Sequence, residues 1–73
     1  MTLMEVIVAL ECAPFRVIEN HTPLTDVVRK LDFRKHKKKW TDYIVNELYP
    51  NADRDNGPFL DIYIRKREKY DEL

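Results

Sequence analysis

Few residues of the sequence belong to the types that build reactive centres. There are one cysteine, one glycine and two histidines among 73 residues. A single cysteine cannot form an intrachain disulfide or a thiolate zinc cluster, and Cys12 beside a predicted strand is typical of a buried apolar residue. A single glycine cannot build a glycine-rich phosphate loop. These shortages exclude most enzyme chemistries.

The remaining candidates for catalysis or metal binding form no recognisable set. His21 follows a predicted strand and His36 stands within a run of basic residues, so neither has a ligand or catalytic partner at a characteristic spacing. The aspartates near Gly57 lack the glutamate that closes a calcium loop. We therefore expect a protein that is not an enzyme, with no catalytic residues, no cofactor and no metal site.

The sequence also lacks a long apolar run. Glu5 and Glu11 interrupt the apolar N-terminal segment and no basic residues precede it, whereas a spanning helix needs about 20 apolar residues. The absence of disulfides suits a reducing compartment. Together these features predict a cytoplasmic protein with no signal peptide and no membrane partner.

The composition is that of a folded chain. Hydrophobic residues make up 44 % and include one Trp, four Tyr and three Phe, whereas disordered chains are poor in aromatic residues. A chain of this length forms one domain, residues 1–73, and buries only about 60 % of the surface that its unfolded form exposes. Its margin of stability is accordingly small.

Three strands are predicted. Period-two spacing runs over 4–10 and returns over 60–64, and residues 15–19, beyond Pro14, can form a second, shorter strand. The first of these strands is partly apolar on both faces, which favours a central position in the sheet. A turn signal at Asn56-Gly57-Pro58 precedes the last strand.

Two helices are predicted between the second and third strands. A helix over 23–31 is indicated by a cap at Thr22 and by apolar residues at helical spacing. These residues are Leu24, Val27, Val28 and Leu31. A second helix over 33–49 would pack an aromatic-rich stripe inwards and end at Pro50. The stripe consists of Phe33, Trp40, Ile44 and Leu48, with Tyr43 at its edge.

The predicted element order is β-β-α-α-β, which defines a small α+β domain. We expect a three-stranded sheet, antiparallel or mixed, with two helices packed on one face. The long helical connection allows the last strand to pair beside the first. Residues 65–73 form a charged tail that either frays or extends the last strand.

The net charge is zero, but the basic residues are concentrated. Residues 29–39 hold seven basic side chains and one acidic side chain, a net charge of +6. Because a helix start already presents partial positive charge, a run of cations there is locally unfavourable. Such a run suggests an acidic partner surface or phosphates. Together with the end of the last strand, it supplies the predicted partner-binding residues. They are Arg34, Lys35, Lys38, Lys39, Arg65 and Arg67.

Other interpretations of the basic run stay open at this stage. One is a solvated helix face that acidic residues elsewhere in the fold partly neutralise, and another is a contact with RNA or DNA. A helix-turn-helix over 22–49 is weakly supported. Its turn has no glycine, and its second helix offers mostly lysine, which contacts phosphate rather than bases.

In size, charge layout and lack of catalytic residues, the chain resembles small phage-encoded regulators that bind a host machine. The residues behind this resemblance are the basic run 34–39 and the basic stretch 65–69 on an otherwise acidic domain. The resemblance implies binding, by charge and shape, to an acidic surface of a host complex such as bacterial RNA polymerase, with inhibition or redirection of transcription. Anti-defence inhibitors of the same size would share these features. The sequence sets no oligomeric state.

Overall fold

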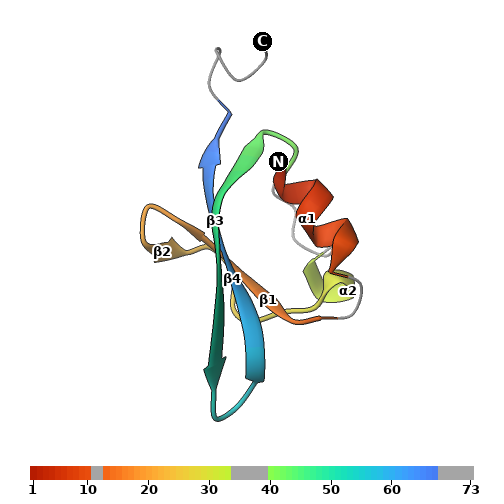
Figure 1. Cartoon of the computed structure of the whole chain (residues 1–73), viewed down its shortest axis with the longest axis vertical. Coiled ribbons are helices and arrows are strands. Elements are labelled where there is room, and N and C mark those ends of the chain that lie inside the picture. Colours follow the sequence, from red (N-terminus) through yellow and green to blue (C-terminus); the bar gives the residue numbers. More distant parts are fainter. Residues whose placement is uncertain (11–12, 34–39, 68–73) are drawn as a thin grey trace.

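Two short helices lie on one side of a mixed four-stranded sheet (Figure 1). The structure, a computed structural model, describes residues 1–10, 13–33 and 40–67. The elements follow the order α-β-β-α-β-β. They are α1 (Leu3–Ala9), β1 (Phe15–Glu19), β2 (Thr22–Pro23), α2 (Lys30–Phe33), β3 (Tyr43–Asp53) and β4 (Gly57–Lys66).

The strands lie side by side in the order β2-β1-β4-β3. β1 and β4 form a parallel centre, in which Phe15 is opposite Leu60. β2 and β3 are antiparallel edges of this pair. The α+β class, the number of helices and the mixed sheet are confirmed, whereas the positions of the helices, the three-stranded sheet and the β-β-α-α-β order are wrong. The strand predicted over 15–19 is confirmed, and β4 contains the strand predicted over 60–64.

The first difference from prediction is at the N-terminus, where residues expected to form a strand make the helix α1. Its buried residues are Leu3, Val6 and Ile7. Their spacing of three and four fits a helix as well as the apolar alternation fits a strand. A capping box decides between the two, since Thr2 Oγ1 accepts from the Glu5 N–H at 3.3 Å and the Glu5 carboxylate accepts from the Thr2 N–H at 3.2 Å. These bonds satisfy N–H groups that a helix start leaves unpaired.

Replacing Thr2 by alanine is expected to lower the free energy of unfolding by about 1 kcal/mol, because the cap is lost from a helix of two turns. Urea denaturation followed by the emission of Trp40 measures this change. Thr41→Ala is the matched control, since Thr41 is exposed in the turn before β3. Equal stabilities of the two variants would contradict the role of the capping box.

The chain reverses direction after β1 in a tight turn. Asn20 and His21 have positive φ angles of 51° and 63°, which are the angles of a two-residue hairpin turn. Glu19 then pairs with Thr22 at the start of β2. The predicted break at these residues is correct, but a strand follows it instead of a helix.

The second difference is the segment that follows β2. Residues 24–28 follow β1 through a series of bends. The Leu24 N–H donates to the Val17 carbonyl at 2.8 Å, and Val28 and Phe15 exchange two backbone hydrogen bonds of 2.8 Å. The helix predicted over 23–31 is therefore wrong. Only α2, a single turn, forms here, and Leu31 is 72 % exposed instead of buried. The β-branched residues of this segment disfavour a helix, and Val28 adds to the pairing of β1.

The third difference is β3. Residues 43–49 were predicted to be helical but form a strand, and Pro50 lies inside that strand instead of ending a helix. Consecutive Tyr, Ile and Val residues favour a strand. Gly57, with a φ of 67°, then leads into β4. Asn-Gly is a strong hairpin signal, so a strand before it as well as after it is the expected arrangement. Residues 34–39 of the predicted helix lie outside the described residues.

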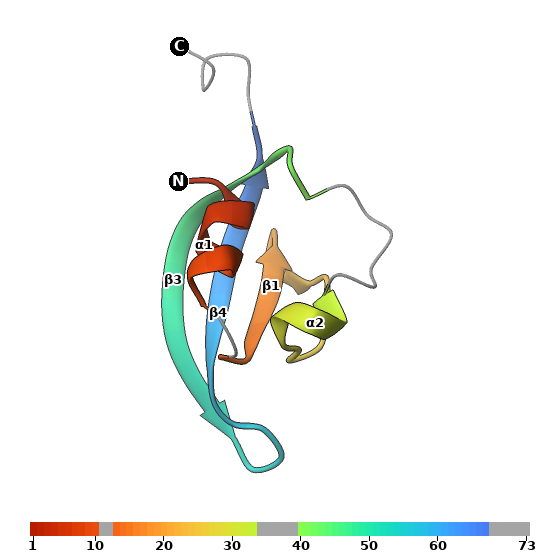
Figure 2. The same ribbon diagram turned by 90° about the vertical axis from the view of Figure 1, so that its right-hand side faces the viewer.

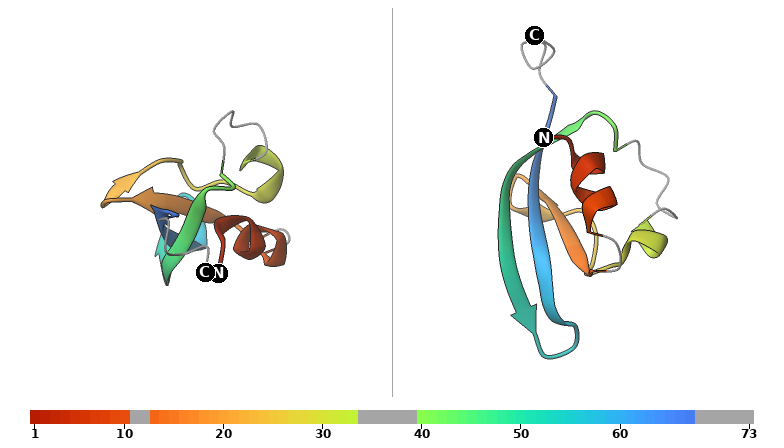
Figure 3. Two further views of the ribbon diagram at one scale, coloured as in Figure 1. Left: turned by 90° about the horizontal axis from the view of Figure 1, so that it is seen from above. Right: turned by 45° about the vertical axis from the view of Figure 1, so that its right-hand side comes forward.

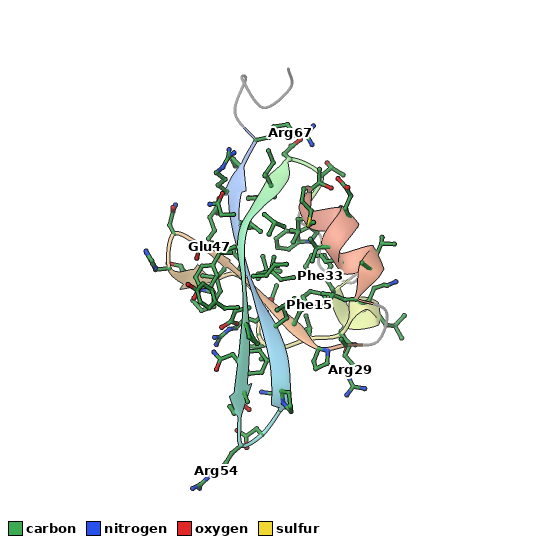
Figure 4. All side chains as sticks on the ribbon, viewed as in Figure 1. Phe15, Arg29, Phe33, Glu47, Arg54 and Arg67 are labelled. Atoms are coloured by element: carbon green, nitrogen blue, oxygen red, sulfur yellow. The ribbon has the colours of Figure 1, made fainter. Side chains whose placement is uncertain are left out.

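One hydrophobic core lies between the helices and the sheet (Figure 2). Its aromatic members form a chain of ring contacts, with centroid separations of 5.3 Å for Phe15–Phe33, 4.7 Å for Phe33–Trp40 and 5.8 Å for Trp40–Tyr43. Figure 4 shows Phe15 and Phe33 approaching each other from β1 and α2. The aliphatic members come from α1 and the central strands. They are Leu3, Val6, Ile7, Val17, Ile62 and Ile64.

Both helices contribute to this core and lie on one face of the sheet, as was expected of two helices formed by other residues. Within the described residues, neither helix has the length or apolarity needed to cross a membrane. β4 continues to Lys66, so the described part of the predicted charged tail 65–73 extends the last strand. The rest of that tail, 68–73, lies outside the described residues.

Candidate partner-binding site

The predicted partner-binding residues fall into two groups. Four of them, Arg34, Lys35, Lys38 and Lys39, lie outside the described residues. Arg65 is near the C-terminal end of β4 and Arg67 directly follows that strand. The three residues 65–67 are called the basic end below.

The residues on either side of the basic run are fixed in the core. Phe33 and Trp40 are 2 % and 7 % exposed, and their ring centroids are 4.7 Å apart. The two described residues that flank the run therefore lie side by side in the core. The helix-turn-helix interpretation fails in the described residues, because its first helix is absent and the second half of its recognition helix is β3.

The basic end lies beside residues 42 and 43, which follow Trp40 in the sequence. Tyr43, in ring contact with Trp40, lies opposite Lys66 in the sheet register. The Arg67 N–H donates to the Asp42 carbonyl oxygen at 2.7 Å. The start of β3 and the end of β4 thus lie side by side at one end of the domain (Figure 3).

Within the basic end, Arg65 and Arg67 differ in the exposure of their side chains. The Arg65 Nε donates to Asn46 Oδ1 at 3.0 Å, at the bulge between Val45 and Glu47 in β3. Arg65 is therefore half-buried and held against the strand, whereas Arg67 is exposed. Figure 4 shows Arg67 at the end of the molecule opposite Arg54, which lies in the β3–β4 turn.

An acidic side chain lies beside the basic end. Hydrogen bonds from the Thr2 hydroxyl and backbone hold the pKa of Glu5 below its ordinary value, and the positive charge of Arg67 adds to the effect. Glu5 is therefore a carboxylate at neutral pH. The surface at this end of the molecule carries both signs of charge.

The sheet face opposite the helices carries a second group of polar residues, which the predicted site did not include. Arg16 and Asp61, on the neighbouring strands β1 and β4, form a bidentate ion pair with distances of 2.8 and 3.0 Å. The Asn51 amide on β3 donates to the same carboxylate at 2.9 Å. Asp61 is 2 % exposed. Burial alone would raise the pKa of Asp61, but the bonds from Arg16 and Asn51 outweigh it and lower the pKa.

Aromatic side chains surround this ion pair. The Arg16 guanidinium lies 5.3 Å from the centroid of the Phe59 ring, a distance at which cation–π attraction operates. Tyr49 and Tyr63 meet edge to face with centroids 5.8 Å apart, and Tyr49 is 54 % exposed. The sequence contained the signal for this face, because Phe59, Asp61 and Tyr63 alternate with the core residues of β4.

The outer edge of β3 is protected against pairing with another strand. Leu60 turns its N–H towards β1, where the Pro14 carbonyl accepts it at 3.2 Å. Its antiparallel partner Pro50 therefore faces the outer edge of β3, where proline offers no donor. The Ala52 N–H on the same edge is taken by Asn51 Oδ1 at 2.8 Å. A further edge donor, the Val45 N–H, is taken by the Met1 carbonyl at 3.0 Å.

In the part of the chain that the structure describes, His, Cys, Asp and Glu side chains form no group of three that could hold a metal ion. Comparisons with protein-family models, with curated proteins and with solved structures each found no match for this chain. The geometry of the molecule itself is therefore the basis for its proposed function.

Proposed function

We propose that this protein is a small, non-enzymatic regulator that binds an acidic surface of a larger protein complex. The observation that supports the proposal is the position of the basic end beside residues 42–44, which follow the basic run 34–39 closely in the sequence. A concentrated charge of one sign raises the rate of association with an oppositely charged surface. Bacterial RNA polymerase is the complex that we propose as the first to be tested.

The mixed charge at this end favours a protein partner over a nucleic acid. Glu5, a carboxylate at neutral pH, lies near Arg67 and would repel a phosphate backbone. Protein surfaces carry both signs, so an acidic partner patch with one basic residue fits this arrangement better. Arg65 and Arg67 are the described residues that would contact the partner, together with Lys35, Lys38 and Lys39 of the basic run.

Reversing the charge of Lys35, Lys38 and Lys39 together to glutamate is expected to weaken binding to purified bacterial RNA polymerase about tenfold or more. The reason is that lost attraction is replaced by repulsion. A second variant, Arg65→Glu with Arg67→Glu, should have a similar effect. Biolayer interferometry measures both affinities.

Arg54→Glu is the matched control, because Arg54 lies at the opposite end of the molecule. Its affinity for the polymerase should equal that of the wild type. Unchanged affinity in the triple variant would contradict the proposal. A gel shift of random-sequence RNA or DNA at physiological salt, with a steep loss of affinity as salt rises, would instead assign the basic segments to nucleic acid.

A further inference from the structure

A groove of about 370 Å³ lies between α1 and the β3–β4 hairpin. Six of the seven residues that line it are apolar, and the seventh is Glu5. Met1 and Leu48, on its two sides, are 73 % and 43 % exposed. A partner that covers such side chains stabilises the complex by about 25 cal/mol for each Å² of apolar surface that it buries.

The groove exists because the helix is much shorter than the strand it covers. α1 has 7 residues and is about 10 Å long, whereas β3 has 11 residues and is about 36 Å long. Leu48, Pro50 and Ala52 follow one another on the helix side of β3 and all are exposed. An apolar row therefore continues from the groove along the hairpin, beyond the end of α1.

Two ways of covering this surface are disfavoured. Strand addition to β3 meets an edge on which Pro50 has no donor and the Ala52 donor is already bonded. Packing against the same groove of a second copy would bring two Glu5 carboxylates into one apolar interface. The residues that line the groove include no basic side chain, and like charges repel each other more strongly in an apolar interface than in water.

We propose that the groove binds an amphipathic helix of a partner protein. The apolar face of that helix would lie on Leu48 and Leu60, parallel to the exposed row of β3, and extend the helical layer that α1 leaves incomplete. A lysine or arginine of the helix would lie beside Glu5. Helices bind apolar grooves through side chains spaced three and four residues apart. This binding mode is separate from the basic end and goes beyond the function proposed above.

A displayed library of amphipathic helical peptides, with randomised apolar and flanking positions, tests this inference on the full chain. The selected peptides are expected to carry large apolar residues at helical spacing together with lysine or arginine. Leu48→Ser should weaken their binding about tenfold through lost apolar contact. Glu5→Gln should weaken it about two- to fivefold by removing one exposed ion pair. Glutamine also serves in a capping box, so α1 keeps its cap.

Leu31→Ser is the control, because Leu31 is an exposed leucine on α2, outside the groove, and its replacement should leave peptide binding unchanged. The variant with Arg65→Glu and Arg67→Glu should also keep binding the peptides, which separates this inference from the function proposed for the basic end. Peptides that bind the wild type and Leu48→Ser equally, or a library that yields no binder, would overturn it. A dimer in sedimentation that Leu48→Ser dissociates would assign the groove to a second copy.

Discussion

Phe15→Ala is expected to leave most of the protein unfolded. Phe15 is fully buried and packs edge to face on Phe33 at the junction of β1 and α2. Removing a buried phenylalanine side chain costs about 3–5 kcal/mol, which is close to the whole stability expected of so small a domain. Urea denaturation followed by emission from Trp40, the single tryptophan, measures the loss.

Two variants control this experiment. Phe15→Leu keeps most of the volume and should cost less than about 1.5 kcal/mol. Leu31→Ala should change the stability by less than about 0.5 kcal/mol, since Leu31 is 72 % exposed. A large loss with Leu31→Ala would contradict the structure of this segment and favour the buried helix face that the sequence predicted.

Asp61→Ala is expected to lower the free energy of unfolding by about 2–3 kcal/mol. The substitution leaves the Arg16 guanidinium and the Asn51 amide without the acceptor that they share, the buried carboxylate of Asp61. Breaking a fully buried ion pair costs about 3–5 kcal/mol. The loss expected for Asp61→Ala is smaller than this, because the Arg16 side chain is 29 % exposed. Asp55→Ala, in the exposed β3–β4 turn, is the control. A double-mutant cycle with Arg16→Met isolates the energy of the ion pair.

The pH dependence of stability provides a further test of Asp61. Its pKa in the folded protein lies below the ordinary value, so the unfolded chain takes up a proton first as the pH falls. The contribution of Asp61 is therefore complete at neutral pH and is lost as the pH drops below about 4 and through the folded pKa. The difference between wild type and Asp61→Ala should shrink over that range. A constant difference down to pH ~2 would show that the ion pair is not its source.

The sequence predicted the elements that have one dominant local signal. Residues 60–64 alternate cleanly, residues 15–19 stand between Pro14 and the break at Asn20-His21, and the two segments form the central strands. Residues 4–10 satisfied both a strand and a helix pattern, and the deciding signal was Thr2 with Glu5 three residues later, a capping box that precedes the pattern. A local cap thus outweighed the period of the apolar residues.

Tertiary pairing explains the two remaining errors. The apolar residues of 24–28 match a helical face, but β1 has a free edge on that side and the segment completes it through Val28. The helical wheel over 33–49 grouped Trp40 and Ile44 correctly as inward or half-covered residues. It could not show that β4 needs an antiparallel partner, which the Asn56-Gly57 turn supplies.

The residues of the candidate site were predictable only where a local pattern of the sequence marks them. Arg65 and Arg67 followed from charge alone, and the structure places them beside residues 42–44 at the start of β3. The ion pair of Arg16 with Asp61 joins residues 45 positions apart. No local pattern relates two such residues, because their proximity depends on the parallel pairing of β1 with β4.

That parallel pairing also constrains how the chain acquires its structure during synthesis. The centre of the sheet forms only when β1 pairs with β4, the last described strand. The entropy of closing the long loop between these strands opposes their pairing early in folding. Folding should therefore be a single late event that depends on contacts between distant residues. A nascent chain that stops before Ile62 would hold β1, α1 and β3 without the strand that joins them, and would present their apolar faces to chaperones and proteases.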